Sequence, residues 1–460
     1  MKAARGRSAV ALGLAALLLA AGCSNAPPGP GPGPEKGELV FATGSDLSST
    51  GVRQDLIEDW SRRTGQRVRI VKLPDTADGQ RSQLLAAGQS GNSGYDVLNI
   101  DVAWTAEFAK AGVIQPWGAK LDPDFLDSVA KTAVDGGGTV WAVPFNTDAG
   151  LLYYRKDILE GYGHDRPPTN WGELKNVAEE VAAAYNRDTA RLGKRRNTMY
   201  GLVTQLRPYE GLTVNTLESA WANGGDPDAT SFTKGEQVGA LQQGVADLKT
   251  RLDSIMPHEA TDMDETESRR WFADGRALFM RNWPVEYASV AEKLRPGKDF
   301  DVAELPGRPT DGKRMSVLGG QNLAVAADSA HPEAARELIR ALTDPHSERC
   351  LLERGFAATR DSSYRDPGRA PACHLPPGKA ERAERDAPPD HDPGQGREPP
   401  YKRTLYAALR AAEPRPRSVH YQMFSKVVQI RVSEYLGTTL GTAIADRLAR
   451  EADEALSGRN

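Results

Sequence analysis

The stretch YDVLNID, residues 95–101, is a short apolar run that ends on a carboxylate. Two similar runs precede it, ELVFA at residues 38–42 and RVRIVKL at residues 67–73. The segments between these runs, residues 52–63 and 78–88, are predicted helices, and in the first of them apolar residues recur at helical spacing. Three strands that alternate with helices in this way predict an α/β fold with a parallel, doubly wound sheet.

Polar residues follow the first and the third predicted strand. Ser45 and Asp46 come shortly after residues 38–42, and Asp101 ends the third run. In open α/β sheets, ligands bind outside the carboxyl ends of the strands, so these three residues are candidate binding residues. A role for Asp101 as the N-cap of a predicted helix over residues 102–112 stays open as the alternative.

Length and charge narrow the class of protein. The chain has 460 residues, enough for two or three domains with their own cores. Its 58 basic and 62 acidic residues leave no excess of Lys and Arg to neutralise phosphates, so we expect no nucleic-acid partner. The single apolar run that approaches membrane-spanning length lies at the N-terminus, which argues against a membrane channel.

The N-terminal residues predict export and lipid anchoring. Three basic residues precede an apolar stretch over residues 9–21, which is shorter than the roughly 20 residues that a spanning helix needs. LAAGCS, residues 19–24, resembles a bacterial lipobox, in which the cysteine carries the lipid after cleavage. We therefore expect residues 1–22 to be a signal peptide, Cys23 to be lipidated, and the Pro- and Gly-rich residues 23–37 to be a tether.

Two further cysteines remain once Cys23 is assigned to the lipid. Cys350 and Cys373 form an even pair in an oxidising compartment, which favours a disulfide; two unrelated free thiols are the alternative. No Cys/His spacing indicates a zinc site, and we expect no metal or cofactor. The proline- and charge-rich residues 366–400 are predicted to be an exposed insertion.

Motifs for catalysis are missing from the sequence. It contains no P-loop, no GxSxG and no HExxH. A pair of carboxylates for glycoside hydrolysis needs to be close only in space, so a secreted glycan-active enzyme stays open as an alternative.

Seven segments resemble solute-binding proteins of carbohydrate ABC importers, in the order in which that family has them. One of them, made of residues 209–213 and 223–225, looks most like the trehalose/maltose-binding branch. The other segments are residues 95–112, 143–157, 168–174, 271–280, 319–325 (with 331–335) and 415–421.

This resemblance implies a periplasmic-binding-protein-like fold of two α/β lobes joined by hinge crossovers. It places the hinges near Pro144 and Met315, and it puts the 366–400 insertion within the second lobe. The first lobe is expected to comprise residues 38–143 and 317–347, and the second residues 147–312 and 350–460.

Sugar chemistry supports the site residues that the resemblance implies. A sugar offers hydroxyl groups that both donate and accept, and apolar faces that stack on aromatic rings. Acceptors are therefore expected at Asp101, Asn146, Asp148 and Glu210, although turn chemistry explains Asn146 and Asp148 equally well. A first-turn acid that interacts with the helix dipole is the alternative role for Glu210.

The remaining site residues supply stacking and donors. Trp283, next to a proline, is the expected stacking platform, and Arg415, flanked by prolines, the expected donor, with Arg417 as second choice. Gly320 and Gln321 complete the set, and Gln321 stands where relatives often have an aromatic residue.

The expected function is that of a lipid-anchored receptor on the outer face of the cell membrane. It captures a di- or oligosaccharide by hinge closure and delivers it to the permease subunits of an ABC importer, as a monomer and without catalysis. A binding protein for a polyamine or a metal ion is the main alternative.

Overall fold

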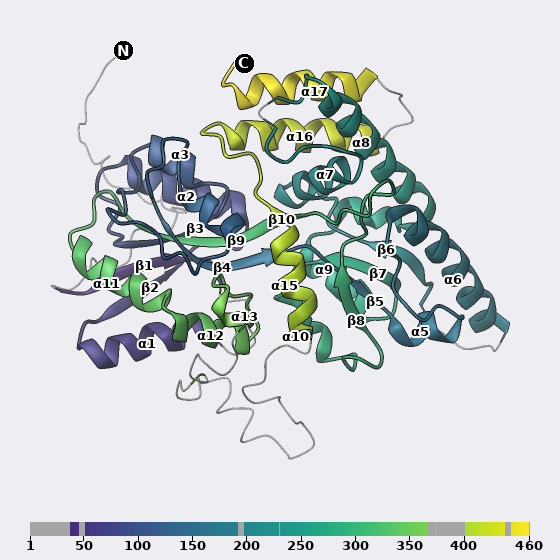
Figure 1. Cartoon of the computed structure of the whole chain (residues 1–460), viewed down its shortest axis with the longest axis horizontal. Coiled ribbons are helices and arrows are strands. Elements are labelled where there is room, and N and C mark those ends of the chain that lie inside the picture. Colours follow the sequence, from purple (N-terminus) through teal and green to yellow (C-terminus); the bar gives the residue numbers. More distant parts are fainter. Residues whose placement is uncertain are drawn as a thin grey trace, which may run out of the picture.

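The computed structural model describes residues 37–45, 51–191, 197–229, 231–365, 373, 401–437 and 443–459. Asp46, Cys23, the predicted signal peptide and most of the tether and of the 366–400 insertion lie outside these residues. The described part of the chain folds around two separate β-sheets, with helices packed on both (Figure 1).

The first sheet has six strands in the order β10-β9-β3-β1-β2, with β4 also paired to β9. The strands β1, β2 and β3 run parallel, as the sequence predicts, while β9 returns antiparallel to both β3 and β4. The sheet is therefore mixed. Its strands are β1 (Leu39–Thr43), β2 (Val68–Lys72), β3 (Val97–Asp101), β4 (Val143–Ala149), β9 (Ser316–Val325) and β10 (Ala412–Glu413).

The second sheet has four strands in the order β6-β7-β5-β8. The chain enters it directly from β4, because Gly150 alone separates β4 from β5. Its strands are β5 (Leu151–Tyr154), β6 (Tyr200–Val203), β7 (Ala277–Asn282) and β8 (Asp301–Glu304).

Helices cover both sheets, and the amphipathic ones bury one face. In α11, Ala335, Leu338, Ile339 and Leu342 are buried at helical spacing, and a proline begins the helix. The helices are α1 (Val52–Thr64), α2 (Ala77–Gln89), α3 (Thr105–Lys110), α4 (Asp127–Ala130), α5 (Lys156–Gly161), α6 (Trp171–Arg191), α7 (Glu210–Ala222), α8 (Glu236–Ile255), α9 (Glu265–Ala273), α10 (Glu286–Ala291), α11 (Pro332–Leu342), α12 (Pro345–Glu353), α13 (Ser362–Arg365), α15 (Lys402–Ala411), α16 (Tyr421–Leu436) and α17 (Ala443–Leu456), with 3₁₀ turns η1 (Lys131–Ala133) and η2 (His258–Asp262).

Each sheet has its own core, which confirms the predicted fold class of two α/β lobes. Around the first sheet, β1 is completely buried between β2 and β3, as its uninterrupted apolar sequence requires. The helices α6, α7, α8, α9, α16 and α17 pack around the second sheet.

The segment around α12 joins both cores. Cys350 and Phe356 belong to the same core as Leu39 in the first lobe, whereas Leu352 and Ala357 belong to the core of the second. The expected start of the second lobe at residue 350 therefore falls inside a helix that contacts α1 and α11. Side chains of one helix face opposite ways, so this helix lies between the lobes and belongs to neither alone.

The structure joins Cys350 and Cys373 in a disulfide, the pair favoured by the sequence. Their Cα atoms are 4.8 Å apart. The backbone N–H of Cys373 also donates to Glu353, so this residue is fixed to α12 by two contacts.

Candidate functional site

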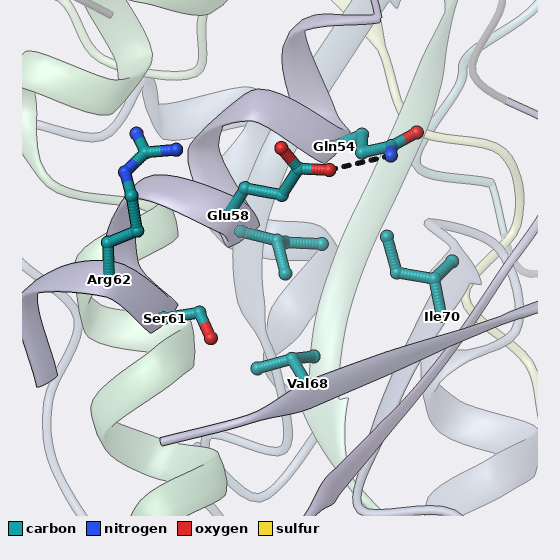
Figure 2. A pocket seen from close by; sticks show the side chains of 7 residues that line it. Gln54, Glu58, Ser61, Arg62, Val68 and Ile70 are labelled. Carbon is teal, nitrogen blue, oxygen red and sulfur yellow. Dashed lines mark hydrogen bonds between the residues drawn. The ribbon is translucent and has the colours of Figure 1, made fainter. Parts of the chain in front are cut away.

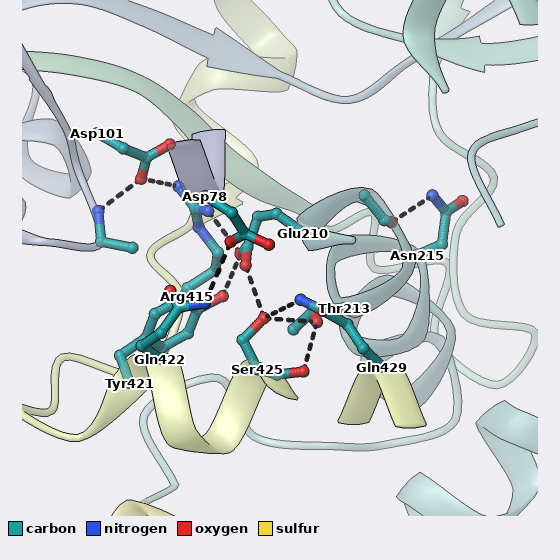
Figure 3. Close-up of polar contacts among 12 residues, drawn as sticks. Asp78, Asp101, Glu210, Thr213, Asn215, Arg415, Tyr421, Gln422, Ser425 and Gln429 are labelled. Atoms are coloured by element: carbon teal, nitrogen blue, oxygen red, sulfur yellow. Dashed lines mark hydrogen bonds and ion pairs between the residues drawn. The ribbon is translucent and has the colours of Figure 1, made fainter. Parts of the chain in front are cut away.

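Three of the predicted site residues meet where the two lobes come together (Figure 3). Arg415, just after β10, donates to Asp101 at 2.5 Å through Nη2 and to Glu210 at 2.7 Å through Nη1. Asp101 ends strand β3 of the first lobe, and Glu210 begins helix α7 of the second. One guanidinium therefore connects a carboxylate of each lobe; we name Asp101, Glu210 and Arg415 the Arg415 cluster.

Helix α16 supports this cluster from the second lobe. Tyr421 and Ser425, one turn apart on α16, both donate to the carboxylate of Glu210. Ser425 in turn contacts Thr213 Oγ1 at 2.8 Å and Gln429 Nε2 at 2.9 Å (Figure 3). These contacts fix the carboxylate of Glu210 in place.

Burial and charge act in opposite directions on Arg415, whose side chain is 3% exposed. Burial lowers the pKa of Arg415, but Asp101, Tyr421 and Glu210 outweigh burial and raise that pKa above its ordinary value. The guanidinium therefore stays charged, and its charge is neutralised inside the protein.

Asp101 is not the N-cap of the following helix. Helix α3 begins at Thr105, and its N-cap is Trp104. Asp101 Oδ1 instead accepts the backbone N–H of Ala103 at 2.8 Å, a turn contact that leaves the carboxylate free to bind Arg415.

A second group of predicted residues lies on β4 and β9. Gln321 of β9 pairs with Asp101 on one side and with Asn146 on the other, and Asp148 pairs with Gly319. The turn interpretation of Asn146 and Asp148 is therefore wrong, since both are strand residues. Alternation along β4 puts their side chains on the same face.

Three buried polar atoms of Asn146 and Asp148 lack partners among the described residues. Asn146 is 1% exposed, and neither its Oδ1 nor its Nδ2 has a hydrogen-bond partner there. Asp148 is partly exposed as a residue, but its Oδ1 is also enclosed and unpartnered there. Buried polar groups usually have partners, so these atoms are candidates for contact with a polar ligand.

Burial raises the pKa of Asp148 to about 8. Arg281 opposes this shift, while Asp101 and Glu286 add to it. Asp148 is therefore mostly a neutral carboxylic acid at pH 7, able to donate as well as accept a hydrogen bond.

The two glycines on β9 allow close approach. A Cβ atom at Gly320, whose φ is +108°, would lie 2.3 Å from the carbonyl oxygen of Asn146. A Cβ at Gly319 would lie 3.2 Å from Asp148 and 3.3 Å from the ring of Trp283. These distances place Trp283 beside Asp148, next to β9.

Trp283 is held by its neighbours as well. Its indole Nε1 donates to Glu265 at 3.3 Å, and its carbonyl accepts from the Tyr153 hydroxyl at 2.6 Å. The ring itself is partly buried.

Two predicted residues lie apart from these groups. Ser45 donates to Asp75 at 2.8 Å in an exposed contact, and Arg417 is exposed and donates to the carbonyl of Lys131 at 3.3 Å. The structure therefore places neither residue with the Arg415 cluster. Asp46 lies outside the described residues.

Residues that sequence reasoning did not select also connect the lobes. Asp78 on α2 accepts from Lys426 at 2.6 Å and from Gln422 at 3.1 Å, both on α16 (Figure 3). Tyr421 belongs to the recognised 415–421 segment, which was a usable signal for its role. Asp78 and Lys426 are ordinary charged helix residues in the sequence, so nothing local distinguishes them.

A pocket lies elsewhere, between α1 and β2 of the first lobe (Figure 2). Its lining includes Gln54, Glu58 and Arg62 of α1 and the exposed Ile70 of β2, and Gln54 donates to Glu58 there. None of the predicted site residues that the structure describes lines it.

Within the described ranges, no group of three His, Cys, Asp or Glu side chains is arranged to hold a metal ion. Among the helices that the structure describes, none combines the length and apolar character needed to span a membrane.

The fold and the polar junction define a class: proteins that bind a solute between two lobes. The family model of the bacterial extracellular solute-binding proteins matches residues 46–348. A relative from Deinococcus radiodurans, described as "Probable ABC transporter-binding protein", is 31% identical over 67% of this chain and 72% of its own length. The maltotriose-binding protein of Pyrococcus abyssi is 27% identical over 72% of this chain and 68% of its own length.

Solved structures agree in fold. Maltose-bound MalE3 of T. maritima matches with a TM-score of 0.74 and 27% identity, over 92% of this chain and 99% of that one. The GacH receptor of Streptomyces glaucescens, at 20% identity, matches with a TM-score of 0.70 over 92% and 99% of the two chains.

The chain belongs to the bacterial extracellular solute-binding proteins, as its sequence motifs predicted. This family works outside the cytoplasm, and the relatives from Deinococcus radiodurans and Pyrococcus abyssi are both described as binding proteins.

Proposed function

We propose that this protein binds an uncharged sugar, a di- or oligosaccharide, between its two lobes and delivers it to the permease of an ABC importer. The observation that carries the proposal is the contrast between the two groups of site residues. In the Arg415 cluster both carboxylates already bind the guanidinium, while Asn146 and Asp148 offer unpartnered polar atoms.

This pattern favours hydroxyl groups over ions. A polyamine would need free carboxylates, but Asp101 and Glu210 are already paired with Arg415, and the raised pKa of Asp148 keeps it neutral. An amide and a neutral carboxyl both donate and accept, which matches the behaviour of a sugar hydroxyl. Trp283 supplies the aromatic surface for an apolar sugar face.

The relatives support a glucose-oligomer ligand. MalE3 was solved with maltose, and the relative from Pyrococcus abyssi is a maltotriose-binding protein. Ligand contacts on β4 and β9, the strands that lead from one lobe to the other, would stabilise the closed arrangement of the lobes.

We also propose the remaining features expected from the sequence. Apart from the α12 segment, the two lobes have the bounds expected from the sequence. Residues 1–22 are a signal peptide, and Cys23 is lipidated on the outer face of the membrane. The protein acts as a monomer and without catalysis. Ser45, Asp46 and Arg417 are peripheral to the site that we propose.

A thermal-shift screen of the purified full chain tests this proposal. Maltose, maltotriose, other sugars, polyamines and ferric ion are the probes, and products are analysed after overnight incubation. A ligand at about 100 times its Kd adds roughly 2.7 kcal/mol, a shift of several degrees. Stabilisation by one sugar class, with the sugar left intact, is the expected result.

Asn146→Ala sharpens the test. It removes two polar atoms without partners, so we expect unchanged or higher stability but an affinity for that sugar at least about tenfold lower. Ser45→Ala, at a half-buried residue away from the cluster, is the matched control and should keep full affinity. Full affinity in Asn146→Ala, or a response to polyamines alone, would refute the proposal.

A further inference from the structure

Arg281 is a buried arginine that is not among the proposed ligand contacts. It lies in β7, two residues before Trp283, and its side chain is 1% exposed. Its Nε and Nη2 donate to the two carboxylate oxygens of Glu218 at 2.9 and 2.6 Å. A buried ion pair of this kind often adds little to stability compared with apolar residues, so stability alone does not account for it.

The guanidinium of Arg281 also lies over the indole of Trp283. Its central carbon is 3.8 Å from the ring centroid, well within the roughly 6 Å of a cation–π contact. Glu265 accepts from the indole Nε1, so the ring is held on one face by Arg281 and at its edge by Glu265.

The same ion pair touches both strand connections between the lobes. Glu218 Oε1 accepts the backbone N–H of Val317, in β9, at 3.0 Å. A Cβ atom at Gly150, between β4 and β5, would lie 2.7 Å from Glu218 Oε1 and 2.8 Å from Arg281 Nη2. The pair therefore packs directly against the backbone of both connections.

We infer that Arg281 is a positioning residue: held by Glu218, it fixes the plane of the Trp283 indole relative to β4 and β9. Stacking on a sugar face requires a ring held within roughly 10–20° of the productive orientation, and a ring on a loop needs such support. The inference rests on the proposed function in one respect, namely that Trp283 contacts the ligand.

The test reads Trp283 directly. The full chain is labelled with 5-fluorotryptophan, and Trp283→Phe assigns the Trp283 signal in the ¹⁹F NMR spectrum. Arg281→Met removes the charge and the planar fork, and Arg281→Lys keeps the charge but cannot make the two-pronged contact. We expect Arg281→Met to shift or broaden the Trp283 signal without ligand and to weaken maltotriose binding at least about tenfold, with Arg281→Lys between it and wild type.

Arg251→Met is the matched control. Arg251 is also buried in the second lobe, stacks on Trp171 at 4.6 Å and donates to Ser219 at 2.8 Å. The Arg251→Met variant shows the general effect of removing a buried arginine. We expect it to have a lower Tm than wild type and an unchanged Trp283 signal.

An unchanged Trp283 signal in Arg281→Met, or an equal change in Arg251→Met, would overturn the inference. Because the NMR reading needs no ligand, failure of wild type to bind maltotriose would count against the proposed ligand and not against the role of Arg281. Should Arg281→Met fail to fold, Arg281→Lys carries the same comparison.

Discussion

Burial of the Asp148 side chain determines whether its carboxyl group carries a charge near neutral pH. Burial of its carboxyl raises its pKa from the ordinary 3.8 to about 8, against the opposing effect of Arg281. The folded state therefore keeps the proton over a pH range in which the unfolded chain has lost it. The stabilisation associated with the neutral carboxyl is complete below about pH 4 and is lost as pH rises to about 8.

Asp148→Asn should remove this pH dependence, because an amide of the same shape does not titrate. Without ligand, we expect the stability of the variant relative to wild type to rise by at least about 2 kcal/mol between pH 4 and pH 8, which for a chain of this length is roughly 2 °C in Tm. Glu348, whose pKa is also raised, is present in both proteins and cancels in the difference. A difference in Tm that is constant with pH would contradict this account.

Arg415 and Arg417 provide a matched pair at the same scale. Arg415→Met leaves the carboxylates of Asp101 and Glu210 without their shared cation, and we expect a loss of about 3–5 kcal/mol in the free energy of unfolding. Arg417→Met changes an exposed residue and should cost less than about 0.5 kcal/mol. Urea unfolding measures the free energy of unfolding of both variants. Similar losses would mean that the contacts of the Arg415 cluster add no more stability than an exposed arginine does.

At the scale of elements, β9 is the strand on which the site depends. It pairs with β3 and β4 in the first lobe and with β10 at its beginning, and its glycines allow β4 and Trp283 to approach. A side chain at Gly320 would meet backbone atoms, which cannot move aside as the end of a flexible side chain can.

Gly320→Ala should therefore destabilise the protein by more than about 2 kcal/mol, because it combines a positive φ with a backbone clash. Gly239→Ala is the control: this exposed helical glycine has open space around it, and alanine there should stabilise by about 0.5–1 kcal/mol. Thermal unfolding of the two variants gives the comparison. Equal effects would show that the close packing of β4 on β9 is not required.

At the scale of the whole molecule, polar contacts hold the two lobes together without a ligand. Arg415 joins Asp101 at the buried junction, and Lys426 joins Asp78 in a more exposed contact. The side chains of Lys426 and Asp78 are 48% and 37% exposed, so salt should screen their contribution more than that of the buried pair.

Lys426→Met should shift the ligand-free protein towards a more open arrangement at low salt. Small-angle X-ray scattering would show a larger radius of gyration than for wild type, and about 0.5 M NaCl should reduce the difference. Lys249→Met is the control, because Lys249 pairs with Asp253 within a single helix. A radius that does not change in Lys426→Met would assign lobe closure to the buried contacts alone.

Much of the local structure could be predicted. The expected strand at 67–73 is β2, the expected helix at 52–63 is α1, and each differs from the structure by a residue or so. The spacing of apolar residues allows these predictions, because a helix and a strand each bury one face at their own sequence period. The helix expected from residue 102 begins three residues later, since Asp101 binds Ala103 and Arg415 in place of capping it.

The sequence by itself determined the alternation of strands and helices, the order of the family segments and most residue types of the site. The tertiary structure decided which of those residues meet. Arg415 and Asp101 are 314 residues apart, and Lys426 and Asp78 are 348 apart. Local sequence patterns predict which face of an element is buried. A contact between charges far apart in the sequence produces no such pattern. The pairing within the Arg415 cluster therefore depends on the folded arrangement of both lobes.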